Sequence, residues 1–137
     1  MTNEAYRLES QRTIRDLAHR RGVSPSLVRW RDKREEGRCR MCLRSSSLRP
    51  LTRHHIVPRV WFKRNGRVAV LRNVSANIVP LCWPCHEYVE WNQYGRSLLR
   101  KVLAAEEVAF VLQVSGREWF DRRYPAHQQR AVILPSI

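Results

Sequence analysis

Two Cys-x-x-Cys pairs constrain the fold of this chain more than any other feature of its sequence. Cys39–Cys42 and Cys82–Cys85 contain all four cysteines of the 137 residues. A pair with this spacing binds a metal ion from a tight turn, and two pairs complete a tetrahedral set of thiolates. The thirty-nine residues between the pairs exceed the spacing of a minimal zinc ribbon, so the pairs must bracket an inserted unit. Because four thiolates leave no open coordination position, the sequence predicts a structural Zn²⁺.

Two redox pairs or plain buried thiols are the alternatives for these cysteines. The chain has no apolar run long enough to span a bilayer, and its first residues, Met1 to Glu4, continue with charge rather than with a signal peptide. We therefore expect a cytoplasmic protein. In that reducing compartment, cysteines serve as metal ligands more often than as disulfides.

Positive charge is the second strong signal. Lysine and arginine total 26 against 12 acidic residues, a formal net charge of +14. Residues 37–86 contain no Asp or Glu but ten basic side chains, from Arg38 to Arg72. Such a surface suits a phosphate backbone, so we expect a nucleic-acid partner. The alternative explanation of the positive charge is a general preference for arginine that is unrelated to a partner. A membrane surface is disfavoured, because no amphipathic helix with an apolar face lies in this window.

Hydrophobic spacing divides the chain into four segments. Residues 11–34 have the pattern of two short helices around a turn, and residues 35–92 carry the cysteines and most histidines. Residues 93–105 and 105–123 have helical periodicity. Gly116 is expected to kink or interrupt the last helix, which Tyr124-Pro125 should end.

The segment between the cysteine pairs predicts the order β-β-α. Leu51–Val57 and Asn77–Leu81 have the character of strands, and Trp83-Pro84 suits the start of a helix. Because side chains alternate along a strand, His54 and His55 should leave opposite faces of the first strand. His86, in the first turn of the helix, could reach one of them.

Asn65-Gly66 lies between these two strands, flanked by apolar and basic residues. The dipeptide favours a two-residue hairpin turn, so we expect a hairpin here. Lys63, Arg64 and Arg67 would lie at its tip, where they could contact phosphate. A solvated loop with incidental charge is the alternative.

One set of residues resembles the HNH endonuclease family: His54-His55-Ile56-x-Pro58, then Asn77-x-x-x-Leu81-Cys82-x-x-Cys85-His86, with Cys39-x-x-Cys42 before them. The resemblance covers about residues 39–91 and is greatest to small phage-type enzymes with a four-cysteine zinc. It implies an α+β fold, with a ββα-metal (HNH, or His-Me finger) nuclease core and four-cysteine zinc knuckles. Helix-turn-helix-like helices would precede this core and C-terminal helices would follow it. The implied activity is metal-dependent hydrolysis of DNA phosphodiester bonds.

The resemblance also implies roles for individual residues. His55 takes the position of the general base, and Asn77 that of the motif asparagine, which braces the loop and the base. His54 and His86 take the positions of ligands of a catalytic divalent ion. This ion would be Mg²⁺ or Mn²⁺, with Zn²⁺ or Ni²⁺ as alternatives. Many relatives have a further histidine four residues after the helix histidine, where this chain has Glu90.

Because Glu90 stands at this position, the resemblance does not identify the third ligand of the metal. On a helix it shares a face with His86, so its carboxylate could complete the metal shell. The alternative is a solvated residue or a salt bridge to Arg96 or Arg100. We expect its neighbour Trp91 in the core.

The chemistry that these roles require is available from the residue types. A neutral imidazole can take a proton from water near neutral pH, and surrounding arginines would favour the neutral form of His55. A divalent ion can hold a phosphate oxygen and the leaving 3′-oxygen, while arginines stabilise the developing charge. The basic residues expected at the DNA are Arg29, Arg53, Arg59, Lys63, Arg64 and Arg67.

The N-terminal segment, residues 1–34, resembles a helix-turn-helix between Thr13 and Trp30, followed by the nuclease domain at residues 35–137. Ser24 is a good N-cap and Pro25 a good first residue for the second helix, which would present Arg29 to the major groove. Ordinary helical hairpins share this pattern. A helical pair packed on the nuclease core is therefore the alternative.

The sequence thus predicts a DNA endonuclease that nicks or makes double-strand breaks. Because each chain would carry one site, a double-strand break would require a homodimer or two cleavage events. The alternative that is not an enzyme is a zinc-ribbon DNA-binding or packaging accessory protein without catalysis. DNA is the expected partner, no membrane is expected, and a phage packaging machinery is a further candidate partner.

Overall fold

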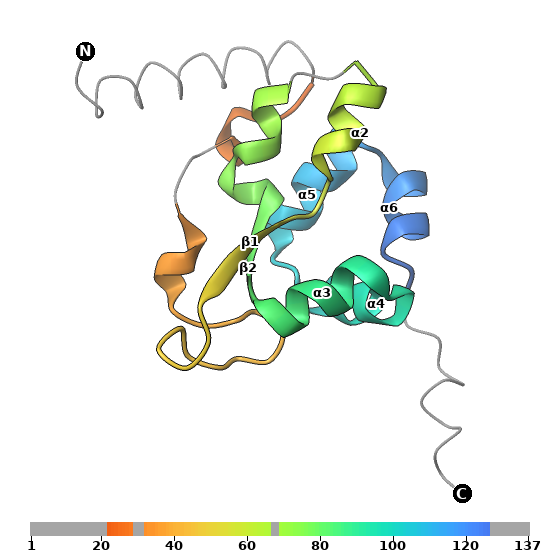
Figure 1. Cartoon of the computed structure of the whole chain (residues 1–137). Helices are drawn as coiled ribbons and strands as arrows, with labels where there is room; N and C mark the ends of the chain where they lie inside the picture. The colour runs from red at the N-terminus through yellow and green to blue at the C-terminus, as the bar shows by residue number, and fades with distance from the viewer. Residues whose placement is uncertain (1–21, 29–31, 67–68, 127–137) are drawn as a thin grey trace, which may run out of the picture.

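The computed structural model describes residues 22–28, 32–66 and 69–126, which form a mixed α+β fold (Figure 1). The elements in chain order are the 3-10 helices η1 (Pro25–Leu27) and η2 (Lys33–Glu36), strand β1 (Leu51–His55), helix α2 (Arg59–Arg64), the 3-10 helices η3 (Ala69–Asn73) and η4 (Ser75–Asn77), strand β2 (Ile78–Cys82), and helices α3 (Trp83–Trp91), α4 (Gln93–Val102), α5 (Ala105–Val114) and α6 (Arg117–Arg123). None of the helices in this described part has the length and apolar character needed to cross a membrane.

The two strands and the helix after them follow the predicted β-β-α order. β1 pairs antiparallel with β2, with Leu51 opposite Cys82 and His55 opposite Ile78. All five residues of β2 are buried, so this strand is the centre of the molecule. Cys82 ends β2 and directly precedes α3, which carries a proline in its first turn as expected.

The predicted hairpin at Asn65-Gly66 is wrong. The connection between the strands instead contains α2, η3 and η4. Asn65 is the C-cap of α2 and its N–H donates to the Trp61 carbonyl, while Gly66 follows with φ +60°. Asn-Gly suits the left-handed end of a helix as well as a hairpin turn. Burial of Phe62 in the core stabilises the helix in this context.

Helices α4, α5 and α6 cover the core. The Asn92 side chain caps α4 by accepting from the backbone N–H groups of Tyr94 and Gly95. A Cβ at position 95 would lie 2.6 Å from the Tyr88 carbonyl oxygen, so glycine permits the close packing of α4 on α3. Gly116, at φ +88°, separates α5 from α6, which confirms the predicted interruption.

The described residues before the first cysteine pack on the same core. Val23, Leu27 and Val28 are buried with the core cluster, and the Ser24 N–H donates to Gln113 Oε1 on α5 at 2.7 Å. A second helix was expected from Pro25, but the described residues form only a three-residue 3-10 helix there. The other residues of the predicted helix-turn-helix, Arg29 among them, lie outside the described ranges.

A buried carboxylate joins three distant segments of this core. Glu107 on α5 is fully buried and pairs with Lys33 of η2, which is 1% exposed. Arg40, between the first two cysteines, donates to both Glu107 oxygens at 2.7 and 3.1 Å. Burial alone would raise the pKa of Glu107, but hydrogen bonds from Arg40 and Lys33 outweigh it and lower the pKa. The carboxylate is therefore charged at neutral pH.

Removal of this carboxylate is expected to destabilise the protein strongly. Glu107→Ala leaves Lys33 and Arg40 without their buried partner, which typically costs about 3–5 kcal/mol. Chemical denaturation of the full chain, followed by circular dichroism, measures the change. Glu106→Ala is the matched control, because Glu106 is exposed on the same helix. Equal unfolding midpoints for the two variants would contradict the prediction.

Candidate active site

The four cysteines form a single cluster, although the two pairs are far apart in sequence. Their Sγ atoms all lie within 4.8 Å of one another, and Cys42 Sγ is 3.7 Å from Cys82 Sγ. No disulfide joins them. A tetrahedral zinc with Zn–S bonds of about 2.3 Å separates its sulfurs by about 3.8 Å. The cluster is thus compatible with the predicted zinc site.

Backbone hydrogen bonds position the first cysteine pair against β2. The Cys39 N–H donates to the Arg44 carbonyl, the Leu43 N–H to the Cys39 carbonyl, and the Arg40 N–H to the Pro80 carbonyl on β2. Leu43 completes the turn with a left-handed φ of +64°. The second pair lies at the end of β2 and in the first turn of α3. The first pair therefore presents its sulfurs from a tight turn, and the second from the junction of β2 and α3.

The electrostatics of the cluster also suit a cation. Burial would raise the pKa of Cys39, but the backbone N–H groups of Cys42, Cys82 and Met41 outweigh it and lower this pKa to about 7. Burial raises the pKa values of Cys42 and Cys85, and the neighbouring sulfurs raise them further. Four adjacent thiolates repel one another, and a bound Zn²⁺ removes that cost.

A second cluster joins β1 to α3. One oxygen of Glu90, Oε1, lies 3.3 Å from His54 Nδ1 and 3.4 Å from His86 Nε2. These ligand atoms all lie within 4.8 Å of one another. His54 is 1% exposed, and its Nδ1 is buried without a hydrogen-bond partner among the described residues. Because a buried nitrogen without a hydrogen bond is costly, this atom is a candidate metal ligand beside Glu90 and His86.

The charges of this second cluster match a divalent ion. Burial lowers the pKa of His54, so its ring is neutral at pH 7. The neighbours of Glu90, His54 first and Arg123 among them, lower its pKa to about 2 against the effect of burial, so the carboxylate is ionised at pH 7. A neutral, buried imidazole and an ionised carboxylate are suitable ligands for a divalent ion, and the carboxylate is the one that suits Mg²⁺ or Mn²⁺. Glu90 therefore lies in the cluster, whereas Arg96 contacts only its backbone carbonyl and Arg100 pairs with Asp121.

Two hydroxyl groups hold the outer sides of the histidine rings. Thr52 Oγ1 is 2.6 Å from His86 Nδ1, and Tyr124 Oη is 3.0 Å from His54 Nε2. Neither residue was predicted from the sequence. Thr52 carried a usable signal, because it precedes His54 by two positions and so shares its face of β1. Tyr124 is seventy residues from His54, and no local pattern connects them.

His55 lies on the opposite face of β1, half-buried among basic residues. Its Nε2 is 3.1 Å from Asn73 Oδ1, a partner that sequence analysis also missed. Burial lowers the pKa of His55, and the charges of Arg59, Arg53 and Arg72 lower it further. The ring is therefore neutral at pH 7, as a general base requires.

Asn77, the last residue of η4, is fully buried directly before β2 and holds the backbone that follows β1. Its Oδ1 accepts from the Val57 N–H at 2.8 Å, and its Nδ2 donates to the Val57 carbonyl at 3.1 Å and the Arg72 carbonyl at 2.9 Å. The Ile56 N–H donates to the Asn77 carbonyl. These bonds fix the backbone just after the two histidines.

The residues predicted to contact DNA are partly described. Arg53, Arg59, Lys63 and Arg64 are exposed, whereas Arg29 and Arg67 lie outside the described residues. Trp91 was expected in the core, and this prediction is wrong, since the side chain is 85% exposed. Helix α3 turns Cys85 and Val89 inward and leaves Trp91 on its solvent side. Trp83 is also exposed, with its ring 6.2 Å from that of His86.

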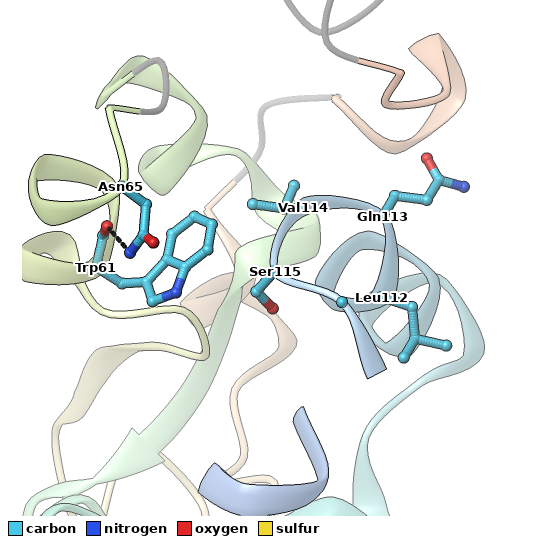
Figure 2. A pocket seen from close by; sticks show the side chains of 7 residues that line it. Trp61, Asn65, Leu112, Gln113, Val114 and Ser115 are labelled. Carbon is cyan, nitrogen blue, oxygen red and sulfur yellow. Dashed lines mark hydrogen bonds between the residues drawn. The ribbon is translucent and has the colours of Figure 1, made fainter. Parts of the chain in front are cut away.

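A separate cavity of about 430 Å³ lies between α2 and the end of α5 (Figure 2). Its lining residues are Trp61, Asn65, Leu112, Gln113, Val114, Ser115 and Gly116. None of them is an acid, a base or a metal ligand of the kinds found in the two clusters. The candidate active site is therefore the end of β1 with the facing turn of α3.

Comparison with known proteins gives one match. Residues 39–89 match the family model described as HNH endonuclease. This segment contains both cysteine pairs, His54, His55, Asn77 and His86, and it ends one residue before Glu90. The chain thus carries an HNH endonuclease domain, which indicates nuclease activity in general. Searches among curated proteins and solved structures found no match.

Loss of one cysteine is expected to release Zn²⁺ and unfold the centre of the protein. Structural zinc binding supplies on the order of 10 kcal/mol, which is comparable with the whole stability of a domain. Cys85→Ser should therefore lose both bound zinc and its cooperative thermal transition, measured by metal analysis and circular dichroism. Brief EDTA treatment of the wild type should leave both intact, because the four-thiolate site is closed. A folded Cys85→Ser variant that retains one zinc would contradict the single-site assignment.

Proposed function

We propose that this protein is a metal-dependent HNH endonuclease of the ββα-metal type that hydrolyses phosphodiester bonds in DNA. The observation that carries the proposal is the convergence of His54, His86 and Glu90 around a buried, unpaired imidazole nitrogen. His55 leaves the same strand on the opposite face. The HNH family match over residues 39–89 supports the same activity.

The residues divide the reaction between the two faces of β1. His54, His86 and Glu90 would hold a divalent ion, Mg²⁺ or Mn²⁺, and such an ion stabilises charge on the phosphate and the leaving 3′-oxygen. His55, whose Nε2 contacts Asn73, would use its other nitrogen to take a proton from the attacking water. Asn77 holds the backbone that connects the two histidines to the following loop.

The substrate-binding part of the proposal rests on charge. Arg53, Arg59 and Arg72 act on His55 from around its ring, and residues 37–86 contain no acidic side chain. The exposed Arg53 and Arg59 would bind the phosphates that flank the scissile bond and stabilise its transition state. Lys63 and Arg64 at the end of α2 extend this basic surface.

A non-catalytic zinc-containing DNA-binding or packaging accessory protein is the competing function. Supercoiled plasmid separates the two: the nuclease nicks it with Mg²⁺ or Mn²⁺ and stops when EDTA is added, whereas the accessory protein only binds. One site per chain makes nicking the expected first product, and double-strand breaks would need a homodimer or two events. Absence of cleavage with every divalent ion tested would refute the nuclease assignment.

Replacement of His55 is expected to abolish cleavage without loss of structure. Removal of a general base typically costs about 10²–10⁴-fold in rate. Plasmid nicking by His55→Ala should therefore fall by that factor, while zinc content, circular dichroism and DNA affinity remain those of the wild type. Nicking at the wild-type rate by this variant would show that His55 is not the base.

Glu90 is expected to control which metal supports the reaction. Glu90→Gln should raise the Mg²⁺ concentration needed for half-maximal nicking, because the amide is a weaker ligand than the carboxylate. Glu90→His should favour softer ions such as Zn²⁺ or Ni²⁺. Glu87→Gln is the matched control, since Glu87 is exposed on the same helix and lies outside the cluster. A Glu90→Ala titration curve that overlays the wild-type curve would exclude Glu90 as a ligand.

A further inference from the structure

We propose that Thr52 and Tyr124 are positioning residues that fix the tautomers of His86 and His54. In the fixed tautomers, one unprotonated nitrogen of each ring faces Glu90. This inference rests on the proposed catalytic metal site and adds two residues to it. Tyr124 lies well beyond the segment 39–89 that matches the family.

The tautomer of His54 follows from the hydroxyl of Tyr124. Tyr124 Oη lies 2.6 Å from the Ile56 carbonyl oxygen and 3.0 Å from His54 Nε2. A carbonyl oxygen can only accept, so the proton in the shorter contact belongs to Tyr124. A tyrosine has one hydroxyl proton, and its oxygen must therefore accept from His54. Nε2 then carries the proton of the neutral ring, and Nδ1 is left unprotonated.

The same argument applies to His86 and Thr52. Thr52 Oγ1 lies 2.7 Å from the Leu81 carbonyl oxygen and 2.6 Å from His86 Nδ1. The threonine proton is given to the carbonyl, so the hydroxyl oxygen accepts from His86 Nδ1. His86 Nε2 is then the unprotonated nitrogen. In both cases a backbone carbonyl determines, through one hydroxyl, where the imidazole proton lies.

The consequence is a set of three acceptors directed at one another. His54 Nδ1 and His86 Nε2 lie 3.3 and 3.4 Å from the same Glu90 oxygen. When both rings are neutral and the tautomers are fixed in this way, no proton lies between these atoms. Their lone pairs repel unless a cation lies among them. Outer partners that fix the tautomer of metal-binding histidines typically affect metal affinity by about 10–100-fold.

Tyr124 is itself held rigidly. Its side chain is fully buried, its N–H donates to the Phe120 carbonyl at 2.8 Å, and its own carbonyl accepts from Arg100 Nη1 at 2.8 Å. The hydroxyl of Tyr124 is therefore placed by α4 and α6, so these C-terminal helices form part of the metal site. Thr52 is placed by β1 and its bond to β2.

Mn²⁺ binding to the zinc-loaded full chain tests the proposal. Electron paramagnetic resonance of free Mn²⁺ gives the dissociation constant, and ¹⁵N-labelled histidine reports by NMR which ring nitrogen carries the proton in the absence of Mn²⁺. We expect His54 protonated on Nε2 and His86 on Nδ1 in the wild type. Tyr124→Phe and Thr52→Val should bind Mn²⁺ about 10–100-fold more weakly. Thr52→Ser keeps the hydroxyl and should bind Mn²⁺ as the wild type does.

Two controls separate positioning from general stability. Tyr88→Phe removes a hydroxyl from an exposed tyrosine on α3 and should change neither the affinity nor the tautomers. If Tyr124→Phe does not fold, the Thr52→Val and Thr52→Ser pair decides, because valine is isosteric with threonine. The opposite tautomers in the wild type, or unchanged Mn²⁺ affinity in Thr52→Val, would overturn the proposal.

These outcomes are independent of the proposed function. A protein that binds Mn²⁺ with the expected tautomers but cleaves no DNA would refute the nuclease activity and retain the two positioning residues. If the wild type cleaves DNA while Thr52→Val and Tyr124→Phe bind Mn²⁺ normally, the nuclease activity is retained and the positioning roles of Thr52 and Tyr124 are refuted.

Discussion

The buried carboxylate of Glu107 is the constraint on which the arrangement of the molecule depends. It binds Lys33 from η2, Arg40 from the first cysteine turn and the backbone N–H of Ala104. A buried charge is tolerated only when its partners are fully in place, so these segments must dock together. Arg40 also donates its N–H to Pro80 of β2. Through Arg40, the carboxylate and this bond to β2 hold the first cysteine pair near Cys82 at the end of β2 and Cys85 in α3, where the four sulfurs meet.

From this frame, a five-residue strand creates two chemically different surfaces. Thr52 and His54 face α3, where Glu90 supplies negative charge, whereas Arg53 and His55 face the opposite side among arginines. Burial lowers the pKa of both histidines. On one face the neutral ring can serve as a metal ligand, and on the other as a base for water. The alternation of β1 thus places the two rings on opposite faces although the residues are adjacent.

The sequence was most informative where chemistry is local. The cysteine spacing, the His54-His55 pair and the two strands predicted the sulfur cluster, the opposite faces of β1 and the β-β-α order. Tertiary packing decided the rest. Asn65-Gly66 ends a helix because Phe62 is buried, and Trp91 is exposed because α3 directs Val89 and Cys85 inward. Lys33, Asn73 and Tyr124 have partners that are distant in sequence, and periodicity carries no information about such pairs.

The segment that matches the HNH family is smaller than the unit that builds the site. A fragment of that size buries little apolar surface and is marginally stable without a metal or flanking helices. Here the two cysteine pairs lie near its two ends, while α4, α5 and α6 supply Leu99, Phe110 and Phe120, respectively, to the core. The same helices bring Glu107 to Arg40 and Tyr124 to His54. An unpaired nitrogen is costly inside a protein, and a small motif alone could avoid that cost by rotating the imidazole. Because Tyr124 holds the outer nitrogen, the ring cannot turn, and the free nitrogen stays directed at Glu90 and His86.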